Sequence, residues 1–166
     1  PSRGERKAAS DQLQAIGAEL VALGPDDLAR VPLPERLGEA VAEARRITDF
    51  EGRRRQLQFV GKLMRRLDET ELGQIGEGLR VCRSQSAQAA RRLHQAEQWR
   101  DDLIRDDGAL ERWLREFPAT DVRRLRALIR AARQETPPDA PRRHGRAFRE
   151  IFALVRGCLD GAPVSS

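Results

Sequence analysis

The sequence predicts an all-α fold, in which several helices pack antiparallel around one long central helix and form two small subdomains. Leu, Ala, Arg and Glu, which favour helices, are frequent in the 166 residues, whereas only 4% of the residues are aromatic and there is no Tyr. Apolar residues recur at spacings of three and four along most of the chain. No stretch shows the alternation of apolar and polar residues that is typical of a half-buried strand.

The N-terminal subdomain is expected to cover residues 1–69 and to contain three helices and a helical turn. Gly24 and Pro25 end the first helix, and Pro34 suits the first turn of the next one. The expected helices cover residues 8–23, 34–48 and 50–67, with the short turn at 25–30. Thr70 is the expected N-cap of the helix that follows.

A single long helix is predicted at residues 70–107, where it would connect the two subdomains. Apolar or small side chains follow a heptad pattern there, at positions 72, 75, 79, 82, 86, 89, 93 and 96. The helix would end near Arg105 and measure about 50 Å. The alanines at 87–90 suggest close packing against another helix. The pattern also fits a coiled-coil dimer, but Ser86 within the apolar stripe favours packing within the chain.

The C-terminal subdomain is expected at residues 108–166. Phe117 and Pro118 end its first helix, and Thr120 or Asp121 caps the second. The expected helices cover residues 109–116, 121–135 and 146–157. Three prolines keep the loop between the second and third helices extended.

The net charge of +5 is distributed unevenly along the chain. Residues 51–66 contain six basic residues and one acidic residue, and residues 121–166 contain ten basic and five acidic residues, so each segment carries a net charge of +5. The remaining segments, 1–50 and 67–120, have net charges of −2 and −3. Only two of the 31 basic residues are Lys, and the planar guanidinium of Arg suits phosphate oxygens and base edges.

Basic residues in both positive segments gather on one face of a predicted helix. In the helix at 50–67, the apolar residues share one face and the cations cluster opposite, with Arg53 alone turned toward the apolar side. In the helix at 121–135, four arginines form a row. Because like charges one turn apart repel, a solvated face usually mixes both signs, so the pattern favours a polyanionic partner such as nucleic acid. With a basic loop, the candidate RNA-binding residues are Arg53, Arg54, Arg55, Gln56, Gln58, Lys62, Arg65, Arg66, Arg123, Arg126, Arg130, Arg133, Arg142, Arg143 and Arg146.

The sequence gives no argument for catalysis, for a metal or for a cofactor. His94 and Glu97 lie one turn apart, but a catalytic zinc needs three protein ligands. The glycine-rich segment 73–78 lacks the Lys and the Ser or Thr of a P-loop. Asp101 and Asp102 are adjacent and point apart on a helix, so they are no ready acid–base pair.

The cysteines and the distribution of apolar residues indicate where the protein is located and which partners it has. Neither cysteine belongs to a Cys-X-X-Cys or Cys/His motif, so we expect both to be small buried residues in a reducing cytoplasm. No apolar run approaches the roughly 18 residues of a membrane span, and the first residues lack the apolar region of a secretory signal. We therefore expect a cytoplasmic monomer with no membrane partner and no small-molecule substrate.

Five blocks of sequence follow one another over nearly the whole chain. They are LGPDDLARVPLPERLGEAVAEARRI, EGRRRQLQFVGKLMRRLDE, LHQAEQWRDDLI, FPATDVRRLRALIRAARQE and a closing R-x-F-x-x-I-F-x-L-V-R pattern. With these blocks the chain resembles the bacterial YjgA/DarP family of small, all-helical, ribosome-associated proteins. The second block is the most specific of the five.

The resemblance implies a function that the residues alone do not give. Members of that family associate with precursors of the large (50S) ribosomal subunit and act late in its assembly, when ribosomal RNA around the peptidyl-transferase centre matures. No enzymatic activity is implied. The motifs that match carry the resemblance onto Arg53, Arg54, Arg55, Gln56, Gln58, Lys62, Arg65, Arg123, Arg124, Arg126 and Arg130.

Two other functions stay open. The first is a protein–protein interaction module that uses the long heptad helix, whose binding would barely respond to salt. The second is a hydrolase acting on RNA, in which Asp101, Asp102 or His94 would have to meet a metal or an acid–base partner in space. The main hypothesis is a non-enzymatic assembly factor that binds ribosomal RNA and pre-ribosomal particles.

Overall fold

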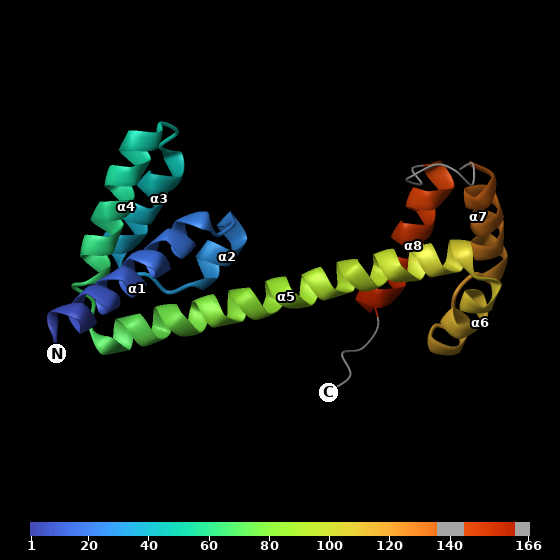
Figure 1. The fold of residues 1–166 in the computed structure, drawn as a ribbon, viewed down its shortest axis with the longest axis horizontal. Helices are drawn as coiled ribbons and strands as arrows, with labels where there is room; N and C mark the ends of the chain where they lie inside the picture. The colour runs from blue at the N-terminus through green and yellow to red at the C-terminus, as the bar shows by residue number, and fades with distance from the viewer. Residues whose placement is uncertain (136–144, 162–166) are drawn as a thin grey trace. The chain divides into compact units, whose positions relative to one another are not determined.

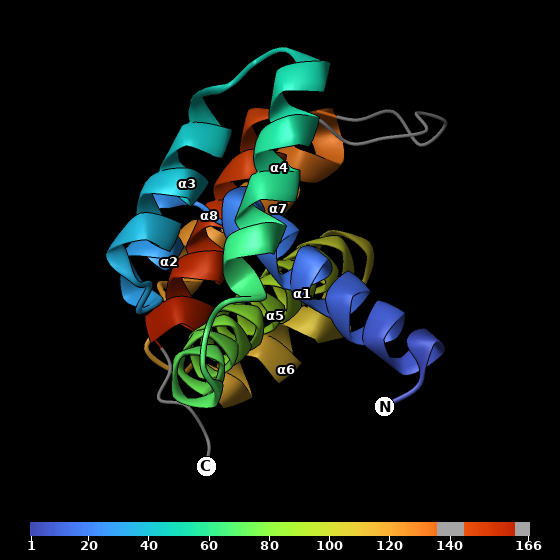
Figure 2. The same ribbon diagram turned by 90° about the vertical axis from the view of Figure 1, so that its left-hand side faces the viewer.

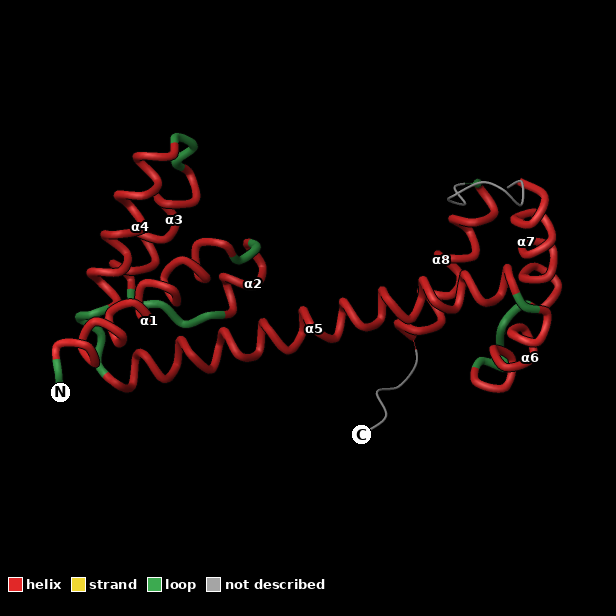
Figure 3. The backbone as a smooth tube through the Cα atoms, viewed as in Figure 1, coloured by secondary structure: helices red, strands yellow, loops and turns green. Residues whose placement is uncertain are grey.

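A computed structural model of the chain describes residues 1–135 and 145–161, and it confirms the all-α prediction. These residues form eight α-helices and no strand (Figures 1 and 3). The helices are α1 (Arg3–Ala22), α2 (Pro25–Arg30), α3 (Glu35–Arg46), α4 (Phe50–Met64), α5 (Glu69–Arg105), α6 (Asp107–Glu116), α7 (Val122–Glu135) and α8 (Arg146–Gly161). None of the helices in the described ranges is long and apolar enough to span a membrane.

The chain divides into two compact units, residues 1–85 and 86–166. The central helix predicted from the heptad pattern is present as α5, which continues from the first unit into the second. The start of α5 belongs to the core of the first unit, where Ile75 and Leu79 are fully buried. The boundaries of the three segments proposed from the sequence stay predictions.

The first unit is built around a hairpin of α3 and α4, which lie side by side and pack against α1 (Figure 2). Its core is aliphatic, as the composition requires. The largest fully buried side chains are Leu20, Leu37, Val41, Val60, Met64, Ile75 and Leu79. This core fixes α4 by its apolar face and leaves the opposite face of the helix to solvent.

Two glycines allow α1 and α4 to cross at close range. A Cβ atom added at Gly17 would lie 2.9 Å from Cγ1 of Val60, and one added at Gly61 would lie 1.8 Å from Oε1 of Gln14. The side-chain amide of Gln14 lies over Gly61 and donates a hydrogen bond to the carbonyl of Leu57 at 2.8 Å. The crossing therefore fixes the rotation of α4 about its own axis.

Hydrogen bonds at the helix starts explain where the observed helices differ from the predicted ones. Asp68, not Thr70, caps α5, because its carboxylate accepts from the backbone N–H of Glu71 at 2.7 Å and the Glu71 side chain accepts from the N–H of Asp68. Ser2 and Glu5 form the same reciprocal pair, which starts α1 at Arg3 rather than at residue 8.

The middle of α5 does not pack as the heptad pattern suggested. Its stripe is buried at Cys82 and again at Ala96, but every residue from 83 to 91 is exposed, and Leu93 is 39% exposed. The expectation that the alanines at 87–90 contact another helix is therefore wrong in the described residues. The helices of the first unit cover α5 only as far as Cys82, and those of the second unit begin to cover it at Ala96.

The second unit packs α6, α7 and α8 onto the end of α5 around Trp113, which is fully buried. The indole Nε1–H of Trp113 donates to the hydroxyl of Thr120 at 3.0 Å, and its ring meets Trp99 edge-on and stacks on Phe117. Of the two caps expected for α7, Asp121 is the one observed, because its carboxylate accepts from the N–H of Arg124. The last helix, α8, extends to Gly161 rather than ending at 157.

Candidate nucleic-acid interface

The first group of predicted site residues lies on the exposed face of α4. Asp49 caps this helix by accepting from the N–H of Gly52 at 2.7 Å. The cations on the helix and just after it are all exposed. We call this group the α4 cationic face; its members are Arg53, Arg54, Arg55, Lys62, Arg65 and Arg66.

Most side chains of the α4 cationic face have no partner in the part of the chain that the structure describes. This is true of Arg53, Arg55, Lys62 and Arg66. Arg54 pairs with Glu51 at 3.2 Å, and Arg65 donates to the Ser10 hydroxyl at 3.3 Å. Both of these contacts are exposed. An exposed ion pair such as that of Arg54 contributes only about 0–1 kcal/mol, so phosphate oxygens could replace Glu51 as its partner.

The two glutamines of the second sequence block have different surroundings. Gln58 is exposed, as the prediction of an RNA contact requires. Gln56 is half-buried, and its amide donates to the carbonyl of Ala40 at 3.0 Å, which ties α4 to α3. The sequence pattern did not indicate this structural role, because nothing in it reveals which carbonyl of α3 faces the amide.

The second group, the α7 arginine row, consists of Arg123, Arg126, Arg130 and Arg133. All four are exposed, but they differ in their contacts. Among the described residues the first three have no hydrogen-bond or ion-pair partner for their side chains. Arg133 is held in place, because it donates to the carbonyl of Ile104 at 2.7 Å and pairs with Asp107 at 2.8 Å.

The third predicted patch is described only in part. Arg142 and Arg143 lie outside the described residues. Arg146, the first residue of α8, is 84% exposed and forms an ion pair with Glu150 at 2.8 Å. This pair joins two residues one turn apart on α8, where a salt bridge contributes only a few tenths of a kcal/mol, roughly 0.3–0.5.

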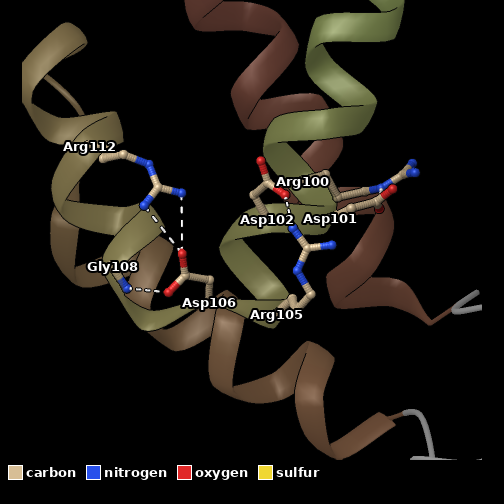
Figure 4. A network of polar contacts seen from close by, with 7 residues as sticks. All are labelled: Arg100, Asp101, Asp102, Arg105, Asp106, Gly108 and Arg112. Carbon is tan, nitrogen blue, oxygen red and sulfur yellow. Dashed lines mark hydrogen bonds and ion pairs between the residues drawn. The ribbon is translucent and has the colours of Figure 1, made fainter.

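The acidic residues near the end of α5 already have partners within the second unit (Figure 4). Asp101 pairs with Arg100 and Asp102 pairs with Arg105. Asp106 accepts from the N–H of Gly108 at 2.9 Å and pairs with Arg112 at 3.2 Å (Figure 4). The N–H of Gly108, together with Arg112, holds the pKa of Asp106 below its usual value of 3.8.

No group of three or more His, Cys, Asp or Glu side chains that could hold a metal ion is present in the described ranges. Each of the two aspartates named for a hydrolase instead contacts an arginine. His94 lies exposed on the surface of α5. The described geometry thus offers cationic surfaces and carboxylates that are paired with arginine.

Comparison with known proteins decides the family. A family model described as "Dual-action ribosomal maturation protein DarP" matches residues 1–156. The chain belongs to the DarP family. The resemblance seen in the five sequence blocks is therefore confirmed, and the family is one of ribosomal maturation proteins.

Individual DarP proteins match over almost the whole chain. A dual-action ribosomal maturation protein DarP from Cupriavidus pinatubonensis is 46% identical over 159 residues, which cover 96% of this chain and 77% of that protein. The DarP protein from Paraburkholderia xenovorans is 40% identical over 166 residues, covering 100% of this chain and 80% of that protein. The DarP relationship supports ribosome maturation as the functional class, and the contacts of individual arginines with RNA stay predictions.

Proposed function

We propose that the chain is a non-enzymatic assembly factor that binds ribosomal RNA in precursors of the large (50S) ribosomal subunit. It would act in the cytoplasm, late in assembly, and promote maturation around the peptidyl-transferase centre. Membership of the DarP family supports the general class, ribosome maturation. The observation that carries the RNA contact is the α4 cationic face, where four exposed cations have no partner among the described residues.

The mechanism would resemble that of a chaperone. Guanidinium groups neutralise phosphates of neighbouring RNA helices and lower the repulsion that opposes their close packing. The packed core of the first unit and the bond from Gln56 to Ala40 hold α4 in place, so its cations are presented together on a fixed surface. The factor would leave once contacts of the mature particle replace its own.

Charge reversal on the α4 cationic face tests this proposal. Arg55 and Lys62 lie two turns apart on the same side of α4 and have no partner in the described part of the chain. Because neither contributes a contact to the fold, the double variant Arg55→Glu/Lys62→Glu should keep its helicity. It should lose co-sedimentation with large-subunit precursors in a sucrose gradient.

A matched control separates this effect from a general change in net charge. The double variant Arg91→Glu/Arg115→Glu changes the charge by the same amount at two exposed cations outside the positive segments. It should co-sediment as the unmodified protein does. Undiminished co-sedimentation of the α4 variant, or equal loss in both variants, would contradict the proposal.

The exposed middle of α5 favours one alternative, a protein–protein interaction module. Leu93 is 39% exposed in a stretch whose heptad pattern is otherwise typical of packed helices. Binding through this surface would depend on apolar area, so it would persist at high salt and after RNase treatment. Association with precursors that resists both treatments would support this alternative over RNA binding.

A further inference from the structure

A pocket in the second unit lies beside the α7 arginine row. It is formed where the end of α5 and the start of α6 meet α7, and its volume is about 270 Å³. Sites for small molecules usually measure about 300–1,000 Å³, so this pocket has room for one planar ring system and not for a whole nucleotide. Its wall is apolar and is formed by Leu103, Leu110 and Ile129.

Cations and carboxylates line the rim of the same pocket. Arg126 and Arg130 also line the pocket, and their side chains have no partner among the described residues. Arg133 is fixed by the carbonyl of Ile104 and by Asp107. A site for phosphate alone would not need an apolar wall, and carboxylates at its rim would repel the anion.

Asp107 is the group that points to a hydrogen-bond donor as ligand. Its side chain is 91% exposed although it pairs with Arg133 at 2.8 Å. A carboxylate has about four lone-pair sites, so Asp107 can accept further hydrogen bonds without losing this ion pair. Asp106 is less available, because it already accepts from Gly108 and Arg112.

From this arrangement we propose that the pocket binds a single unpaired RNA base that carries an exocyclic amino group. The ring would lie against the apolar wall, the amino group would donate to Asp107, and the flanking phosphates would meet Arg126 and Arg130. Unpaired bases are commonly held in this way, between apolar or guanidinium surfaces and with hydrogen bonds to their edges. The inference rests on the proposed RNA-binding function and adds a base contact to it.

Three RNA probes of nearly equal charge test the base contact. The first is a duplex with one bulged adenosine, the second has purine riboside at the bulge, and the third is the fully paired duplex. Purine riboside has the ring system of adenine without the amino group. Because only adenosine offers Asp107 a hydrogen-bond donor, the adenosine bulge should bind about tenfold more tightly than the other two.

Variants of the pocket and a matched control complete the test. Asp107→Ala should bind the adenosine and the purine riboside bulges within about twofold of each other, because the hydrogen bond to the amino group is what separates them. Leu110→Trp, which fills the pocket without changing its charge, should have the same effect. Glu111→Ala removes one negative charge from an exposed position of the same helix, and it should keep the preference for adenosine.

The outcomes separate the pocket from the wider function. Salt-dependent binding of all three RNAs with equal affinity would overturn the base pocket and leave the proposed function standing. Retention of the adenosine preference by both Asp107→Ala and Leu110→Trp would also overturn it. Failure to bind any of the RNAs would remove the basis of both proposals.

Discussion

The α4 cationic face and the α7 arginine row arise from similar sequence patterns but have different surroundings. On α4, four exposed cations have no partner in the described chain, and among the described residues only Glu51 forms an ion pair with a member of the group, Arg54. On α7, three of the four arginines border a pocket that also contains an apolar wall and two aspartates. A purely cationic surface suits phosphates, whereas cations mixed with apolar and acidic groups suit a base. We therefore propose that the two similar clusters of arginine contact different parts of one RNA.

The salt dependence of RNA affinity should distinguish the two regions most strongly. With about six phosphate contacts, affinity for duplex RNA should fall with a log–log slope of about −5 against salt concentration. Arg55→Glu/Lys62→Glu should reduce this slope by about two, because each phosphate contact contributes nearly one. Asp107→Ala should leave the slope unchanged. Fluorescence anisotropy over a range of salt concentrations measures the slope for the unmodified protein and for both variants. An equal slope for the unmodified protein and the α4 double variant would show that α4 does not bind phosphate.

Loss of Trp113 should disrupt the α7 region and spare the α4 region. Trp113→Ala removes the largest fully buried side chain of the second unit, and such a change costs about 3–5 kcal/mol. Urea unfolding followed by circular dichroism should show the loss. Hydrogen exchange should show intact protection in α1, α3 and α4, which have their own core. Loss of protection in both units would mean that they unfold together.

A bulky residue at the crossing of α1 and α4 should have the converse effect. Gly17→Leu places a side chain where a Cβ already lies 2.9 Å from Val60, and overpacking of this kind costs about 1–3 kcal/mol. Gly73→Ala is the matched control, because nothing lies within 4 Å of a Cβ at that position. It should stabilise the protein by about 0.5–1 kcal/mol through helix propensity. Equal effects of the two changes would contradict the close crossing.

The two glutamines of the second block should separate stability from binding. Gln56→Ala removes the hydrogen bond to Ala40 and should lower the free energy of unfolding by about 0.5–1.5 kcal/mol. Gln58→Ala should leave stability unchanged and weaken RNA binding, since Gln58 is exposed. Thermal unfolding and anisotropy test both. Destabilisation by Gln58→Ala would show that it also has a structural role.

The smallest effect should come from acidic pH. Hydrogen bonds from Arg83 lower the pKa of Glu19 in the first unit below its usual 4.5, and those from Gly108 and Arg112 do the same for Asp106 in the second. A lowered carboxyl pKa adds stability that is present above the unfolded pKa and is lost as pH falls through the folded value. Because the ion pair is largely exposed, Glu19→Gln should cost no more than about 1 kcal/mol at pH 7 and nothing in strong acid. Thermal unfolding of the unmodified protein and of Glu19→Gln, from pH 7 down to strong acid, measures the difference in stability.

The helices and the buried face of α4 could be predicted because they depend on local sequence. The spacing of apolar residues and the helix propensities predicted each of the eight helices found in the described residues. Asp121 was one of the two caps expected for α7. Apolar spacing also predicted the burial of Val60, Leu63 and Met64 and the exposure of the cations opposite them. Arg53, which the same spacing turned toward the apolar side, is exposed as well. Helix ends were less certain, since a cap at Asp68 depends on the partner that Glu71 provides.

Features that need two distant segments could not be predicted in this way. Three such features depend on how the helices pack. They are the hydrogen bond from Gln56 to the carbonyl of Ala40, the hydrogen bond from Arg133 to the carbonyl of Ile104, and the pocket beside α7. The heptad pattern was misleading for the opposite reason. It records which side of α5 is suited to packing, but it does not show how far the neighbouring helices extend along it.

Because Trp113 lies in the core of the second unit, its fluorescence reports on the folding of that unit without an added label. Both tryptophans, Trp99 and Trp113, lie between residues 86 and 166, and the sequence contains no Tyr. Indole fluorescence therefore follows the second unit alone, whereas circular dichroism follows the helices of both. A difference between the two signals during unfolding, or during titration with RNA, assigns the event to one unit without any label.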